Sequence, residues 1–210
     1  MINSTKKYSV NLIVLGFSFL LLGQVSYGQQ EAQFTQFIHS TQSYNPAYVG
    51  LDGEKSLVAL YRAQWIGIEG APKTQVINYG SPTHWKGLAI GFGLLNDKIG
   101  PTSETLFNLD LSYTVDLSTD ARMAFGIKAR AHLLDINFSL LNQDFSLGLD
   151  PVLNNSIDNR LSPNIGVGVL YYTPDFYLGL SIPSFLEALY FDHSSFSKAK
   201  EKMHFYLSSG

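Results

Sequence analysis

The chain has 210 residues, a formal net charge of −3 and no cysteine. The lack of cysteine excludes disulfide bonds, thiolate metal sites and a lipid attached to a cysteine, and the weak negative charge gives no reason to expect nucleic acid as a partner. Charged residues make up 15% of the chain and aromatic residues 13%, whereas soluble domains are about 25% charged. This composition suits a β-barrel whose outer wall meets lipid.

Residues 1–28 have the pattern of a secretory signal peptide. Two lysines precede an apolar run from Leu12 to Leu22, and the small residues Ser26 and Gly28 stand at the −3 and −1 positions of a cleavage site. The run is shorter than the roughly 20 residues of a membrane-spanning helix, and no later run is longer. We therefore expect an exported chain of about 180 residues, enough for one domain; an uncleaved N-terminal anchor is the alternative.

Alternating apolar and polar side chains predict about eight strands after residue 54. We place them at residues 55–66, 73–82, 87–97, 104–117, 121–136, 162–172, 175–183 and 203–210. The second strand alternates least cleanly. Several of the others set glycines against their apolar face, which leaves room for a lumen, a plug or close packing of opposite walls. The expected organisation is a periplasmic or plug segment at 29–53, followed by an antiparallel transmembrane β-barrel at 54–210.

The clearest signal is a hairpin from Thr105 to Leu134 around a polar turn centred on Thr119. On both arms the odd-numbered positions are apolar and the even-numbered ones are mostly polar or small, so the hairpin has one apolar and one polar face. Each arm is long enough to cross a bilayer, which takes about 9 to 11 residues. We expect opposed polar pairs to fix the register and to point into the lumen: Asp116 with Arg122, Asp110 with Lys128, and Asn108 with Arg130.

Short and long connections alternate along the chain. The short ones are expected at Pro82–Lys86, Ser118–Asp120 and Thr173–Pro174. The others are mostly longer and are expected at Gly67–Pro72, Lys98–Ser103, Asn137–Leu161 and Ser184–Lys202. Outer-membrane barrels combine tight periplasmic turns with longer outer loops. The N-terminus is therefore expected on the periplasmic side of the outer membrane.

Several short motifs stand out from this alternation. They are Gln33–Phe37, Tyr44–Gly50, Tyr61–Trp65, Glu69–Gln75, Asn96–Thr102, Phe125–Ala129 and Ser162–Gly168. In this order and spacing they resemble the PorP/SprF family of type IX secretion system outer-membrane proteins, and the resemblance covers the whole mature chain.

The resemblance implies an integral outer-membrane β-barrel that serves type IX protein export and, in some members, gliding motility or surface attachment of a secreted adhesin. The implied partners are periplasmic ring proteins of the secretion machine, or cargo carrying a C-terminal sorting domain. It implies no enzymatic activity and no cofactor.

Members of the family are commonly longer than this chain, which stops at Gly210 inside an expected strand. Unpaired backbone groups in hydrocarbon cost several kcal/mol each. A product truncated before the barrel closes is therefore expected, with a complete eight-stranded barrel as the alternative.

Two groups of residues are candidates for structural or partner-binding roles. The first group is Asn96, Asp97 and Lys98. It belongs either to a simple hairpin loop whose turn is formed by Gly100-Pro101 or to an outer loop that binds a partner. The second group is Arg62, Gln64 and Trp65. In one reading, Arg62 and Gln64 are a polar pair that points inward, beside an aromatic residue at the membrane interface. In the other, Arg62 pairs with Glu69 or Asp97 and thereby holds an internal plug in place. The first reading is favoured for both groups.

The sequence nominates no metal or catalytic site. The five histidines show no paired ligand spacing, and the oxygen-rich loop at 137–161 departs from the calcium-loop pattern. No nucleophile, phosphate-binding or dinucleotide-binding motif is present. A small porin or solute channel is the main functional alternative to a secretion component, and an outer-membrane enzyme of lipase type has no positive support.

Overall fold

The computed structural model describes residues 40–137, 157–186, 189–192, 198–200 and 203–210. The expected signal peptide, the first part of the expected 29–53 segment and most of the loop at 137–161 lie outside the described residues. Among the described residues, no helix is long and apolar enough to cross a membrane.

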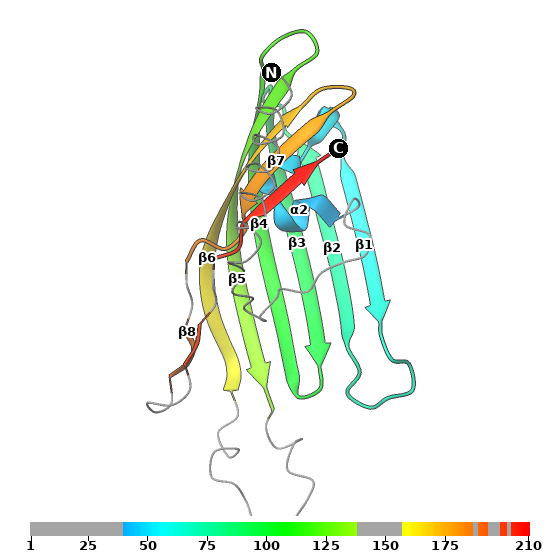
Figure 1. Ribbon diagram of the computed structural model, residues 1–210, viewed down its shortest axis with the longest axis vertical. Helices are drawn as coiled ribbons and strands as arrows, with labels where there is room; N and C mark the ends of the chain where they lie inside the picture. Colours follow the sequence, from blue (N-terminus) through cyan, green and yellow to red (C-terminus); the bar gives the residue numbers. More distant parts are fainter. Residues whose placement is uncertain (1–39, 138–156, 187–188, 193–197, 201–202) are drawn as a thin grey trace, which may run out of the picture. The chain divides into compact units, whose positions relative to one another are not determined.

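Eight strands form one antiparallel sheet in the order β1-β2-β3-β4-β5-β6-β7-β10 (Figure 1). Their bounds are β1 Ser56–Ala63, β2 Lys73–Pro82, β3 Leu88–Ile99, β4 Thr102–Asp116, β5 Arg122–Ile136, β6 Ile157–Tyr172, β7 Tyr177–Ile182 and β10 Tyr206–Ser209. A separate two-stranded sheet contains β8 Leu189–Asp192 and β9 Lys198–Lys200. Three short helical turns precede the strands: α2 Thr41–Tyr44, η2 Pro46–Tyr48 and η3 Leu51–Gly53. The all-β, antiparallel fold expected from the sequence is confirmed.

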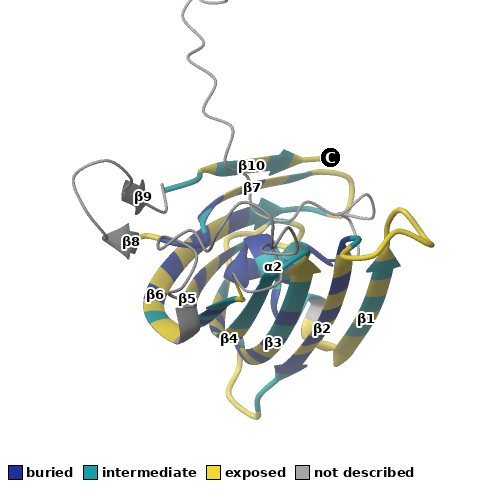
Figure 2. Ribbon diagram, turned by 90° about the horizontal axis from the view of Figure 1, so that it is seen from below, coloured by how far each residue is buried: buried dark blue, intermediate teal, exposed yellow. Residues whose placement is uncertain are grey.

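The sheet curls into a half-barrel around α2 (Figure 2). Within the described part of the chain, β1 pairs with β2 and β10 pairs with β7, and neither has a second neighbour. Among the described strands, β1 and β10 are therefore the two edges of the sheet, and they do not pair with each other.

The convex face of the sheet is apolar. Exposed large hydrophobic side chains gather there: Leu57, Tyr61, Ile77, Tyr79, Ile90, Phe92, Phe107, Leu109, Leu111, Tyr113, Val115, Phe125, Ile127, Ile165, Val167, Val169, Leu178, Leu180 and Leu207. From Phe107 to Leu117 this surface spans about ten residue steps, or about 33 Å along the strand. At the tilt of about 40° usual in such barrels this gives a band about 25 Å tall, which matches the apolar belt of outer-membrane barrels.

The concave face is polar and buried. Its covered polar side chains include Thr74, Asn78, Asn108, Asp110, Ser112, Lys128, Arg130, Asn164 and Ser181. The strand of weakest alternation, β2, alternates regularly from Lys73 to Gly80, with Val76 buried on this face and Ile77 exposed on the other. The chain is therefore polar inside and apolar outside, the reverse of a soluble sandwich.

The register of the central hairpin is the one expected from its sequence. Asp116 lies opposite Arg122, Asp110 opposite Lys128 and Asn108 opposite Arg130. The pairing continues without a shift from Thr102 to Asp116, because a slip of one residue would exchange the apolar and polar faces.

The connections differ from expectation at two places. The expected longer connection at Lys98–Ser103 is wrong, because β3 and β4 continue until only Gly100 and Pro101 separate them. Gly100 adopts a φ of +56°, which a glycine tolerates in so tight a turn. The stretch at Ser184–Lys202 is more than a loop, because it contains β8 and β9. The alternation of short and long connections therefore fails at the β3–β4 turn.

Candidate functional site

A segment ahead of the first strand lies against the concave face of the sheet. We call Ser40–Gly50 the inner segment; it contains α2 and η2, and η2 contacts β4, β5 and β6. Figure 2 places α2 within the curve of the sheet. Much of the segment is buried, namely Ser40, Gln42, Tyr44, Asn45, Pro46, Ala47 and Val49. The Tyr44–Gly50 motif is thus part of the packed interior.

Glycines on the strands allow the inner segment to approach the sheet backbone. A Cβ at Gly91 would lie 2.6 Å from Nε2 of Gln42 and 2.9 Å from a methyl group of Val49. A Cβ at Gly126 would meet the backbone of Pro46 and Ala47, and one at Gly168 would meet the side-chain amide of Asn45. The glycines of the concave face therefore form a bed whose shape fits this segment.

Asn45 connects the inner segment to two strands. Its Oδ1 accepts a hydrogen bond of 2.9 Å from the backbone N–H of Ala47, which caps η2. Its Nδ2 donates to the carbonyl oxygens of Val169 at 3.3 Å and Leu180 at 3.5 Å. One side chain thus sets the local turn and holds it to β6 and β7.

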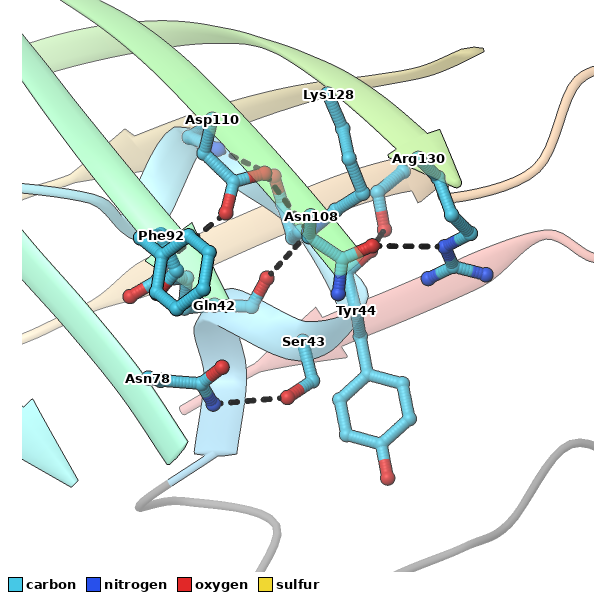
Figure 3. A network of polar contacts seen from close by, with 12 residues as sticks. Gln42, Ser43, Tyr44, Asn78, Phe92, Asn108, Asp110, Lys128 and Arg130 are labelled. Carbon is cyan, nitrogen blue, oxygen red and sulfur yellow. Dashed lines mark hydrogen bonds and ion pairs between the residues drawn. The ribbon is translucent and has the colours of Figure 1, made fainter. Parts of the chain in front are cut away.

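The centre of the site is an ion pair between Lys128 and Asp110. Lys128 Nζ lies 2.8 Å from Asp110 Oδ1, and both side chains have an exposed fraction of 0%. Gln42 contacts both partners: its carbonyl oxygen accepts a 3.1 Å bond from Lys128, and its Nε2 donates a 3.0 Å bond to Asp110 Oδ2 (Figure 3). One carboxylate oxygen therefore forms an ion pair with the ammonium group, and the other accepts a hydrogen bond from the amide.

The burial of this pair has an energetic consequence. Removing a charged group from water costs several kcal/mol, and the attraction between the charges offsets this cost only when the remaining hydrogen-bonding positions are also filled. Gln42 helps to fill them and also donates to the carbonyl oxygens of Tyr79 and Phe92, each at 3.3 Å. The ion pair and the inner segment therefore stabilise each other.

Further polar contacts fix the two ends of the inner segment. Asn78 donates to Ser43 at 2.9 Å, Ser181 donates to the Tyr44 carbonyl at 2.9 Å, and Tyr48 shares a 3.1 Å hydrogen bond with Ser208. Burial raises the pKa of the Tyr48 phenol, although its hydrogen bond to Ser208 acts in the opposite direction. The segment is thus held by strands on both sides of the curve.

Arg130 is the second buried cation of the concave face. Its Nε donates to Asn108 Oδ1 at 3.0 Å, across the strand pair (Figure 3). Its Nη1 donates to Ser184 Oγ at 2.7 Å. The guanidinium group therefore joins β4 and β5 to the chain that follows β7.

The second expected ion pair lies at the rim of the concave face. Arg122 Nε is 3.3 Å from Asp116, and Lys86 Nζ is also 3.3 Å from it. All three side chains are largely exposed. Water screens such pairs, whose contribution to stability is about 0 to 1 kcal/mol, so the two expected pairs occupy very different environments.

Arg62 and Asp97 are brought together through a third residue. Arg62 donates to the Thr74 hydroxyl at 3.1 Å, and this hydroxyl donates to Asp97 at 2.6 Å. This chain of bonds crosses β1, β2 and β3 on the concave side. Asn96 lies on the convex side instead, where it donates to Thr105 Oγ1 at 2.9 Å.

The other candidate residues are exposed at the same end of the sheet. Gln64, Trp65 and Glu69 lie in the connection between β1 and β2, and Lys98 lies near the end of β3. A 2.8 Å backbone hydrogen bond from Gly100 to Gly70 joins this connection to the β3–β4 turn. The two motifs that contain the candidates are therefore neighbours.

Sequence reasoning did not select Gln42 or Asn45 as site residues. Both lie near or within a motif that the sequence analysis singled out, and glycines face them from strands far along the chain. The motif, taken together with small residues at alternate strand positions, is the sequence signal from which Gln42 and Asn45 could have been predicted. Within the described ranges, no group of three or more His, Cys, Asp or Glu side chains is placed to hold a metal ion.

A first prediction concerns the central ion pair. Lys128→Met should lower the free energy of unfolding by about 3 to 5 kcal/mol, because it leaves the Asp110 carboxylate buried without its cation. The double variant Lys128→Met/Asp110→Leu should recover part of this loss. Urea unfolding in lipid vesicles, followed by tryptophan fluorescence, measures both. Arg122→Gln is the matched control at the exposed pair and should cost at most about 1 kcal/mol; equal losses at the two positions would contradict the assignment.

A second prediction concerns the glycine bed. Gly126→Leu should displace the inner segment, because the added side chain occupies the space of Pro46 and Ala47. Chymotrypsin should then cleave at Tyr44 or Tyr48, which are protected by burial in the parent protein. Ala129→Leu adds bulk to the exposed side of the same strand and should leave the protection intact. Continued protection in Gly126→Leu would show that close packing at Gly126 does not hold the segment.

Comparison with known proteins gives one family. Residues 26–210 match the family described as Type IX secretion system membrane protein PorP/SprF. No curated protein and no solved structure matches the chain. The family match covers far more than half of the sequence, in agreement with the ordered motifs and the curled antiparallel sheet. The chain belongs to the PorP/SprF family of type IX secretion system membrane proteins.

Proposed function

We propose that this protein is a non-catalytic outer-membrane component of the type IX secretion system that supports the secretion or surface anchoring of cargo proteins, including adhesins used in gliding motility. The family match supports the assignment to the type IX secretion system. The apolar convex band, about 25 Å tall by the strand geometry above, supports the outer-membrane setting. The proposed partners are periplasmic ring proteins of the machine, or cargo with a C-terminal sorting domain.

The observation that carries the proposal is the covered concave face. Lys128 and Asp110, the charged groups that would line a solute path, are fully buried against each other. Gln42 of the inner segment bonds to both of them. Because these charges are paired with each other and covered by the inner segment, the concave face supports the interpretation as a plugged scaffold better than the interpretation as a solute channel. We propose that the inner segment acts as this plug.

Deletion of the gene tests the proposal. Type IX cargo should be lost from the medium or the cell surface, measured by immunoblotting of cell fractions and by surface labelling, and gliding should be lost where the cargo is a motility adhesin. Re-expression of the parent chain should restore both. Normal secretion and display in the deletion strain would overturn the proposal.

The proposed orientation places the N-terminus in the periplasm. The turns at 83–87, 117–121 and 173–176 would then face the periplasm, and the β1–β2 connection would face the outside. Because the chain has no cysteine, single-cysteine variants report directly on this. A membrane-impermeant maleimide should label Ile66→Cys but not Thr119→Cys in intact cells, whereas both should react after lysis. The reverse pattern in intact cells would invert the orientation.

A further inference from the structure

The connection between β1 and β2 presents large apolar side chains to solvent. We call residues 64–72 the β1–β2 loop. Within it Trp65 is 66% exposed, Ile66 90% and Ile68 63%. Ile99, the last residue of β3 before the adjoining β3–β4 turn, is also exposed. Nothing in the secretion function proposed above uses this group of side chains.

Backbone hydrogen bonds give the β1–β2 loop a defined form. Gln64 donates to Pro72 at 3.0 Å, Ile68 to Trp65 at 3.1 Å and Ala71 to Ile68 at 3.3 Å. The bond from Gly100 to Gly70 fixes the loop to its neighbour. Trp65 has a φ of +51°, a conformation that is costly for a bulky residue and that persists where the surrounding structure maintains it. The loop is therefore built to hold its apolar side chains outward.

Lipid is a poor occupant for these side chains, because polar and basic residues on β2 and β3 separate them from the apolar band. On the convex face, Gln75 lies opposite Asn96, and Lys73 lies opposite Lys98. These positions lie between Ile77, at the edge of the band, and the β1–β2 loop. A lysine in the hydrocarbon costs about 2 to 4 kcal/mol at the midplane, so the two lysines mark the membrane surface and the loop lies beyond it.

The charge beside the loop indicates what kind of surface it fits. Lys73 and Lys98 are exposed and directly opposite each other. Like charges in this position destabilise a strand pair. In the described part of the chain neither lysine has an ion-pair partner. Carboxylates on a bound partner would relieve this repulsion.

We propose that the β1–β2 loop and Ile99 dock a protein partner beyond the membrane surface, and that this partner has an apolar pocket bordered by carboxylates. Trp65, Ile66 and Ile68 enter the pocket, and Lys73 and Lys98 contact its acidic border. The inference rests on the proposed outer-membrane setting, but not on the identity of the cargo.

The first experiment separates protein from lipid as the occupant. The chain has two tryptophans, Trp65 on the β1–β2 loop and Trp85 at the opposite end of the sheet, and their exposed fractions are similar, 66% and 63%. The Trp85→Phe protein, placed in vesicles of brominated phosphatidylcholine, reports on Trp65 alone. Its fluorescence should match that in unbrominated vesicles to within about a tenth, since the bromines lie in the acyl chains. A loss of half or more would place Trp65 in the bilayer and overturn the proposal.

The second experiment tests the docking surface in living cells. The photoreactive residue p-benzoylphenylalanine replaces Ile66 in the full-length chain, and irradiation should give one discrete adduct. Lys73→Glu/Lys98→Glu and Trp65→Ser should each reduce this adduct at least fivefold. Trp85→Ser, the matched control at the other end of the sheet, should leave it unchanged. An adduct that survives all of these changes, or no discrete adduct at all, would overturn the docking surface.

Failure of the proposed docking surface can be distinguished from failure of the proposed secretion function. If the deletion strain loses cargo secretion but the adduct does not form, or survives Trp65→Ser and Lys73→Glu/Lys98→Glu, the docking surface is wrong and the secretion function stands. If the deletion strain secretes normally but the adduct forms and responds to the charge reversal, the docking surface stands and the secretion function is wrong.

Discussion

Lys128 and Asp110 meet at a point in the sheet that water does not reach, and most of the remaining structure depends on how their charges are satisfied. An ion pair alone does not fill every hydrogen-bonding position of an ammonium and a carboxylate group. Gln42 supplies a carbonyl oxygen to one and an amide N–H to the other. An ion pair that would be costly on the bare sheet thereby becomes stable, and the segment that carries Gln42 acquires a fixed position.

The fit between segment and sheet is achieved with little apolar packing. Few of the described hydrophobic side chains are buried, and the contact relies on glycines that allow the backbone of Pro46 and Ala47 and the side chains of Gln42, Asn45 and Val49 to approach the strands closely. This accounts for the composition of the chain, in which many apolar and aromatic residues cover the convex surface and many glycines line the interior. Such an interior tolerates little change, because a methyl group added at Gly126 would meet main-chain atoms of Pro46 and Ala47, which cannot rotate away.

Most of the fold followed from a period of two in the sequence. That period identified the strands, assigned their faces and fixed the register of the central hairpin, because a slip of one residue would have turned charged side chains outward. The turn at Gly100-Pro101 was expected, but the connection around it was predicted too long, because Thr102 and Ser103 are polar and resemble loop residues although their backbone is paired. The β8–β9 hairpin is short, and its sequence carries no regular alternation.

The site was predicted only in part, and the reason is physical. Opposite charges directly across a hairpin can be recognised from the sequence, so Asp110 and Lys128 were found together. Their burial could not be predicted from the sequence, because it depends on a segment that precedes them by more than sixty positions. The family motif around Tyr44 and the glycines on distant strands were both visible, but only a folded chain shows that one lies on the other.

The position of the inner segment also constrains the order in which the chain can fold. It is made before any strand, yet Asn45 bonds to a carbonyl 135 residues later in the sequence, and Tyr48 bonds to a hydroxyl 160 residues later. Contacts of such separation form slowly, because the entropy of closing the intervening loop must be overcome first. The bonds from Asn45 to Leu180 and from Tyr48 to Ser208 can therefore form only once β7 and β10 are in place, so the segment completes its contacts with the sheet late in folding.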